Sequence, residues 1–161
     1  DTMENILISA CLLGVCCRYD GESKPLMQTV VLMERYHLIP ICPEQLGGLP
    51  TPREPSERLG EAVVTKGGAD VTAQFRRGAE QALHLARLYG CKAAVLKERS
   101  PSCGSGEVYD GTFSGRLTPG DGGTAARLKA NGIAVYGESD LDALLVQPEP
   151  PAEEDAQRSL F

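Results

Sequence analysis

Three of the six cysteines in this chain of 161 residues occupy the same kind of position. Cys11, Cys42 and Cys103 each come shortly after a short apolar run, and these runs read ILIS, LIPI and AAVL. Apolar runs of this length, bounded by Gly, Pro and Ser, are typical of buried strands. If the strands are parallel neighbours, their carboxyl ends meet at one edge of a sheet, where α/β folds bind ligands. The pattern therefore predicts that three thiol groups converge on one metal site that keeps an open position.

The residues around these cysteines narrow the choice of metal. Structural zinc usually takes four nitrogen or sulfur ligands, often from closely spaced pairs, and the chain has no C-x-x-C pair. Its histidines, His37 and His84, fall inside helical patterns and are weak zinc candidates. An iron–sulfur cluster is favoured by thiolates, usually four of them. Three ligands would leave one iron open, whereas Cys17 could close the cluster, act as a redox thiol or, like Cys16, have no role.

The composition is that of an ordinary globular domain, with 42% hydrophobic and 24% charged residues. The formal net charge of −6, with no basic cluster, argues against a nucleic-acid partner. The sequence shows neither an apolar run that could span a membrane nor the pattern of a secretory signal, so we expect a cytoplasmic protein. In that reducing compartment its cysteines should be free thiols or metal ligands, and Cys91, which follows a helix pattern, is expected to be a packing residue.

Apolar runs that alternate with helical patterns predict the fold class. The sequence indicates a single three-layer α/β/α domain with a mostly parallel sheet of about four or five strands. We place this domain at residues 3–147 and expect the acidic, proline-rich tail at residues 148–161 to be disordered. Residues 105–123 are rich in Gly and Ser and are expected to form a long loop.

Helix and turn signals divide the rest of the chain. A first helix is expected from about Leu26 to His37, where apolar residues recur at helical spacing. A hairpin is expected to turn at Gly67–Gly68, and the following helix to be capped by Asp70 or Thr72. A last helix is expected to be capped by Ser139.

Six ordered segments make the sequence similar to a known family. They read SACLLGVCCRYDG, ICPEQLGGLPTPR, GGADVTAQFRRGAE, LKERSPSCG, YDGTFSG and GDGGTAARL. These segments resemble the small bacterial family of 2-thiouracil desulfurases, once known only as a domain of unknown function. The resemblance implies a [4Fe-4S] cluster held by Cys11, Cys42 and Cys103, with the fourth iron left for the sulfur of a small thiolated substrate. One departure is Gly123, which stands where the family pattern leads us to expect Val.

Removing sulfur from a thiocarbonyl requires a sulfur acceptor, a nucleophilic water and a proton source. Glu44 lies two residues after Cys42 and is our candidate general acid/base, although a loop-bracing carboxylate would occupy the same place. Ser100 and Ser102 lie just before Cys103. Either hydroxyl is a candidate substrate donor or proton relay, and the plainer role of these serines is to form the turn.

The leading functional hypothesis is iron–sulfur-dependent desulfuration of a thiocarbonyl compound such as 2-thiouracil. One alternative is a non-catalytic electron-transfer or sensor module with a closed four-ligand cluster, and another is a zinc- or thiol-based accessory domain. Arg53, at the end of the long loop after Cys42, is compatible both with substrate contact and with a surface position. The GDGGT segment at residues 120–124 is compatible with an anion cradle or a plain turn.

Overall fold

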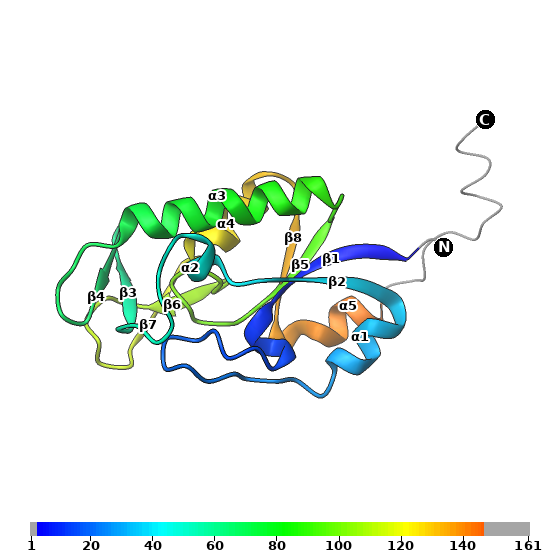
Figure 1. Ribbon diagram of the computed structural model, residues 1–161, viewed down its shortest axis with the longest axis horizontal. Coiled ribbons are helices and arrows are strands. Elements are labelled where there is room, and N and C mark those ends of the chain that lie inside the picture. The colour runs from blue at the N-terminus through cyan, green and yellow to red at the C-terminus, as the bar shows by residue number, and fades with distance from the viewer. Residues whose placement is uncertain (1–2, 147–161) are drawn as a thin grey trace.

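The computed structural model describes residues 3–146, which form a parallel sheet with helices on both faces (Figure 1). The predicted tail at residues 148–161 lies outside these described residues. In chain order the elements are β1 (Glu4–Ser9), the 3-10 turn η1 (Ala10–Leu13), α1 (Thr29–Arg35), β2 (Tyr36–Ile41), α2 (Pro43–Leu46), β3 (Ser56–Leu59), β4 (Ala62–Thr65), α3 (Thr72–Leu88), β5 (Ala93–Leu96), β6 (Glu107–Tyr109), β7 (Leu117–Pro119), α4 (Gly123–Ala130), β8 (Ala134–Gly137), the 3-10 turn η2 (Glu138–Asp140) and α5 (Leu141–Leu145).

The central sheet consists of four parallel strands in the order β2-β1-β5-β8. β1 pairs along its whole length with β2, from Glu4 beside Tyr36 to Ser9 beside Ile41. On its other side, β1 pairs with β5, which comes much later in the chain. The direction in which strands are added to the sheet therefore reverses between β1 and β5. In open α/β sheets, such a switch point creates a ligand-binding crevice beyond the carboxyl ends of the strands.

Two apolar clusters, one on each face of the sheet, hold the layers together. On one face, Leu7 and Leu96 pack with Ala82 and Ala86 of α3 and with Leu128 of α4. The cluster on the other face joins the strands to α1 and α5, and it includes Ile6, Ile8, Val95, Leu32 and Leu141. α3 and α4 lie above the sheet and α1 and α5 below it in Figure 1. The predicted three-layer α/β/α fold is confirmed, with four strands in the sheet.

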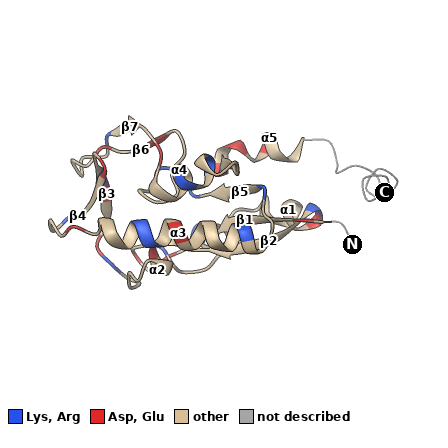
Figure 2. Ribbon diagram, turned by 90° about the horizontal axis from the view of Figure 1, so that it is seen from above, with Lys and Arg blue, Asp and Glu red and all other residues tan. Residues whose placement is uncertain are grey.

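α3 is the most regular helix, with 17 residues, and its apolar side faces the sheet. Its buried residues are Phe75, Gly78, Ala79, Ala82, Leu83 and Ala86. Charged residues lie along the rest of its surface (Figure 2), as expected for an amphipathic helix. The predicted caps of this helix are wrong, because its N-cap is Val71, which has no capping side chain. Asp70, one residue earlier, accepts the backbone N–H of Thr72 at 2.9 Å. No helix among residues 3–146 combines the length and apolar character needed to cross a membrane.

The chain turns at Gly67–Gly68, as predicted. Across this turn Val64 forms an antiparallel bridge with Asp70, and the backbone N–H groups of Thr65 and Val71 donate to the carbonyls of Ala69 and Val63, at 2.8 and 2.9 Å. A longer antiparallel hairpin, which the sequence did not predict, is formed by β3 and β4 and turns at Gly60, whose φ of +64° favours glycine. Strands of four residues are too short for an alternating pattern to show that they pair.

Three other local predictions are corrected by the structure. α1 ends at Arg35, because Tyr36 is already extended and begins β2. The Ser139 hydroxyl does not cap the last helix but donates to the carboxylate of Glu98. The predicted loop after Cys103 contains a small antiparallel sheet of β6 and β7, whose three-residue strands leave no readable period.

Candidate metal centre and catalytic site

A cavity of about 420 Å³ lies at the carboxyl edge of the sheet, beyond the ends of β1, β2 and β5. It is lined by the segments that end or follow these strands, at residues 9–11, 41–44 and 97–103. Tyr109 and Phe113, from β6 and the loop that joins β6 to β7, also line it. The switch point between β1 and β5 thus opens into a hollow of the size that holds a small ligand.

Four of the six cysteines line this cavity, and all six are unpaired. Cys11 lies in η1, the turn that ends β1, and Cys42 directly follows β2. Cys103 lies in the turn after β5, and Cys17 lines the cavity from the loop after η1. Cys11, Cys17 and Cys103 are buried, and Cys42 is partly buried. The structure therefore brings Cys11, Cys42 and Cys103 to one place, and it adds Cys17.

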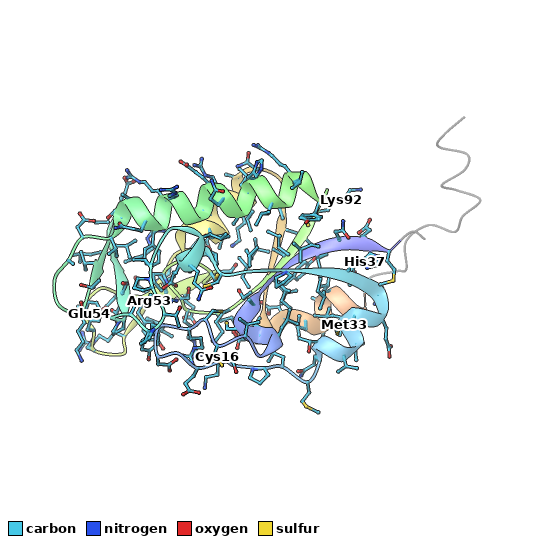
Figure 3. All side chains as sticks on the ribbon, viewed as in Figure 1. Cys16, Met33, His37, Arg53, Glu54 and Lys92 are labelled. Atoms are coloured by element: carbon cyan, nitrogen blue, oxygen red, sulfur yellow. The ribbon has the colours of Figure 1, made fainter. Side chains whose placement is uncertain are left out.

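The other candidate metal ligands lie elsewhere. Cys91 is buried in the core between α3 and the sheet, as predicted. Cys16 is exposed on the outer loop (Figure 3), and His37 and His84 are exposed on β2 and α3. Among residues 3–146, no group of three or more Cys, His, Asp or Glu side chains could hold a single metal ion. A polynuclear cluster accepts a wider spacing, because each thiolate binds a different iron.

Burial and mutual repulsion govern the titration of the cavity thiols. Burial raises the pKa of Cys11 to about 12, and the neighbouring Cys103, Cys17 and Cys42 contribute further. Burial likewise raises the pKa of Cys17 to about 12, with Cys42 as the next cause. Burial also raises the pKa of Cys103 to about 11, although hydrogen bonds from Ser9 and Ser102 act against it. Negative charge on these thiols therefore requires a nearby positive charge, which a bound metal supplies.

The three predicted catalytic side chains form one hydrogen-bonded chain beside Cys103. The Ser102 hydroxyl donates to Glu44 Oε2 at 3.0 Å and lies 3.6 Å from Cys103 Sγ. The Ser100 and Ser102 hydroxyls are 2.9 Å apart. Ser100 Oγ also accepts the backbone N–H groups of Ser102 and Cys103, at 3.1 and 2.9 Å. Ser100 thus shapes the turn, whereas the buried Ser102 connects Glu44 with a cavity thiol.

Arg53 holds the other oxygen of Glu44. Its Nε donates to Glu44 Oε1 at 3.0 Å, and its Nη2 donates to the carbonyl of Cys17 at 2.9 Å. Nη1 donates to the Pro50 carbonyl and to Thr51 Oγ1, at 3.1 and 2.9 Å. The Arg53 side chain is only 7% exposed. The sequence was compatible with a site position or a surface position for Arg53. The structure places Arg53 in the cavity lining, where its partner is the carboxylate of Glu44.

Two further residues near the thiols were missed by sequence reasoning. Ser9, the last residue of β1, donates to Cys103 Sγ at 3.5 Å and accepts the backbone N–H of Lys97 at 2.9 Å. Lys97 Nζ pairs with Glu138 at 3.1 Å, and its positive charge acts to lower the pKa of Cys11. Ser9 ends β1 and Lys97 directly follows β5, and this position at the end of an apolar run is the one sequence signal that could have identified them. Their contacts depend on the pairing of β1 with β5, which a single sequence does not reveal.

The GDGGT segment supports the cysteine turn. The backbone N–H groups of Gly123, Thr124 and Ala125 donate to the carbonyls of Pro101 and Ser102, at 2.9 to 3.1 Å. These are the first N–H groups of α4, which were the candidate anion cradle. The carbonyls of the turn before Cys103 already accept them, so they are not available to bind an anion. A Cβ on Gly122 would come within 2.5 Å of the Ser102 carbonyl carbon, so only glycine fits there.

Close backbone contact between α2 and α3 fixes the position of Glu44. A Cβ on Gly47 would lie 2.0 Å from the carbonyl oxygen of Gln74, and one on Gly78 would lie 2.0 Å from that of Pro43. α2 follows Cys42 directly and carries Glu44 in its first turn. The glycines therefore let α2 sit directly on α3, which sets the place of both a cavity thiol and the carboxylate.

The fold and the site together define a class of protein: a three-layer α/β domain with a thiol-lined cavity at its topological switch point. Comparison with known proteins agrees with this description. The family model described as 2-thiouracil desulfurase matches residues 6–140, and the chain belongs to this family.

Two individual proteins show the extent of the similarity. A protein of Bacillus subtilis (strain 168), the uncharacterized protein YbbK, is 42% identical over an alignment of 150 residues, which covers 87% of this chain and 99% of YbbK. The solved structure of the [4Fe-4S]-dependent thiouracil desulfidase TudS is 50% identical in sequence and superposes with a TM-score of 0.82. That comparison covers 88% of this chain and 95% of TudS, so the likeness extends over the whole fold.

Proposed function

We propose that this chain is a [4Fe-4S]-dependent desulfurase that replaces the sulfur of a small thiocarbonyl compound, such as 2-thiouracil, with oxygen from water. The observation that carries the proposal is that Cys11, Cys42 and Cys103 meet the Glu44–Ser102 pair in one cavity. The likeness to the [4Fe-4S]-dependent thiouracil desulfidase supports both the cofactor and the substrate class. Six unpaired cysteines suit a reducing compartment, and we place the enzyme in the cytoplasm.

The donor set of the cavity fits an iron–sulfur cluster. Cys11, Cys42 and Cys103 would hold it, each from the end of a different strand. Metal binding replaces the protons of buried thiols and offsets the repulsion among their charges. When bound, the cluster supplies an iron without a protein ligand, a thiophilic Lewis acid for the sulfur of the substrate.

The protein side chains would manage the protons of the reaction. A thiocarbonyl and water become a carbonyl and hydrogen sulfide, so protons move from the attacking water to the departing sulfur. Glu44 is placed to take a proton from that water as a general base. Ser102 contacts both Glu44 Oε2 and Cys103 Sγ, so its hydroxyl is placed to pass a proton between the carboxylate and the sulfur side of the cavity. Arg53 holds Oε1, which leaves Oε2 directed at Ser102.

The substitution Glu44→Gln tests the catalytic assignment. It preserves size and one acceptor oxygen but removes the negative charge and proton transfer, so turnover of 2-thiouracil should fall by about 10²–10⁴-fold. Iron and acid-labile sulfide, measured on anaerobically reconstituted protein, should stay at the wild-type level. A wild-type rate with a full cluster would show that Glu44 is not the acid/base.

Cysteine variants test the ligand assignment separately. Cys11→Ser, Cys42→Ser and Cys103→Ser should each lose iron, sulfide and turnover together. Cys91→Ala, at a buried cysteine outside the cavity, is the matched control and should keep all three. Cys17→Ala distinguishes the alternatives: a retained cluster supports three-ligand binding. Loss of iron as complete as in Cys11→Ser would instead favour a closed cluster and an electron-transfer or sensor role.

A further inference from the structure

Backbone strain in this protein is concentrated at the cavity. Among residues 3–146, two residues other than glycine have a φ in the left-handed region, Arg99 at +70° and Phe113 at +56°. Both line the cavity. For a bulky residue such as Phe, this conformation costs about 1–2 kcal/mol, so surrounding contacts must hold it in place. Strain maintained at a ligand cavity is a sign that the position of the side chain matters.

A buried carboxylate holds Phe113 in this conformation. Glu57, on β3, is 9% exposed, and its Oε1 accepts the backbone N–H groups of Gly111 and Phe113, each at 3.0 Å. Among residues 3–146, Glu57 forms no ion pair. Burying a carboxylate is costly unless hydrogen bonds compensate, and here the compensation comes from the backbone of one loop. Glu57 therefore serves to fix that loop, residues 110–115, as part of the cavity wall.

We propose that Phe113 is the surface against which the ring of a planar, heteroaromatic thiocarbonyl substrate stacks, and that Glu57 is the positioning residue that holds it there. The inference rests on the proposed function and adds the residue that selects the ring. The thiols, Glu44 and Phe113 line the same cavity, so a small ring stacked on Phe113 would share that cavity with the groups that act on its C=S group. A stacked aromatic pair contributes about 0.5–1.5 kcal/mol, which corresponds to about 2- to 12-fold in affinity.

The test uses the reconstituted holoprotein and measures the Kd of uracil, the sulfur-free product, by calorimetry, together with KM and kcat for 2-thiouracil. Phe113→Leu should raise Kd and KM by about 2- to 12-fold, with iron content and kcat near wild type. Phe113→Tyr keeps the ring and should stay within about twofold. Tyr89→Leu, at an exposed aromatic residue outside the cavity, is the control and should change nothing.

Glu57 is tested by rescue. Glu57→Ala frees the loop and should raise Kd as Phe113→Leu does, whereas Glu57→Gln keeps an acceptor oxygen for both N–H groups and should restore binding. If the wild type turns over 2-thiouracil while Phe113→Leu binds uracil and 2-thiouracil as well as the wild type does, the stacking inference is wrong and the proposed function stands. If the wild-type holoprotein does not turn over 2-thiouracil, the proposed function fails and this inference fails with it.

Discussion

Arg53→Ala should both destabilise the protein and slow the enzyme. The guanidinium makes four hydrogen bonds, and the most valuable joins it to Glu44, whose side chain is 16% exposed. A charge-assisted bond of this kind contributes about 1.5–3 kcal/mol. The Cys17 carbonyl, left with only the weak donor Cys42 Sγ at 3.7 Å, adds about 1 kcal/mol. Because Ser102 still donates to Glu44, we expect a loss of about 2–4 kcal/mol in the free energy of unfolding. For a domain of this length, each kcal/mol lowers Tm by about 2–4 °C.

The measurement is thermal unfolding of the apo-protein by circular dichroism, paired with turnover normalised to iron content. Arg53→Lys keeps the charge but not the planar fork, so it should recover part of the stability and little of the turnover. A double-mutant cycle with Glu44→Gln isolates the pair, and its coupling energy should exceed about 0.5 kcal/mol. If Arg53→Ala melts within about 2 °C of the wild type and turns over at the wild-type rate, Arg53 does not position Glu44 and our reasoning about the cavity is wrong.

Two further predictions concern the fold that supports the site. Gly78→Ala forces a methyl group against the Pro43 carbonyl, so it should lower the free energy of unfolding by about 1–3 kcal/mol and reduce the bound iron. Gly123→Ala, with no atom within 4 Å of the new Cβ, should leave the stability unchanged or raise it slightly. Equal stability of the two variants would contradict the contact between Gly78 and Pro43. Removing the metal anaerobically with a chelator should leave the far-ultraviolet circular dichroism spectrum intact, because both apolar clusters rest on contacts between strands and helices; an unfolded apo-protein would show that the metal is structural.

Several features of the fold were predictable from local sequence. The apolar runs before Cys11, Cys42 and Cys103 identified three strands, and the alternation with helical periods identified the three-layer architecture. The predictions that were wrong concern short or polar elements. The β3–β4 hairpin was missed, and Ser139 bonds to Glu98 instead of capping the last helix, because strands of three or four residues and single hydroxyl groups carry no periodic signal.

The sequence by itself determined which chemical groups lie beyond the strand ends, because the segments that follow parallel strands all start at the same edge of the sheet. It therefore pointed to three thiols, a nearby carboxylate and two hydroxyls. Only the tertiary structure decided how these groups pair: Glu44 with Arg53 and Ser102, Ser9 with Cys103, and Glu57 with the loop of Phe113. The physical reason is that hydrogen bonds between residues tens of positions apart depend on strand order and on the close contact of α2 with α3, and neither leaves a period in the sequence.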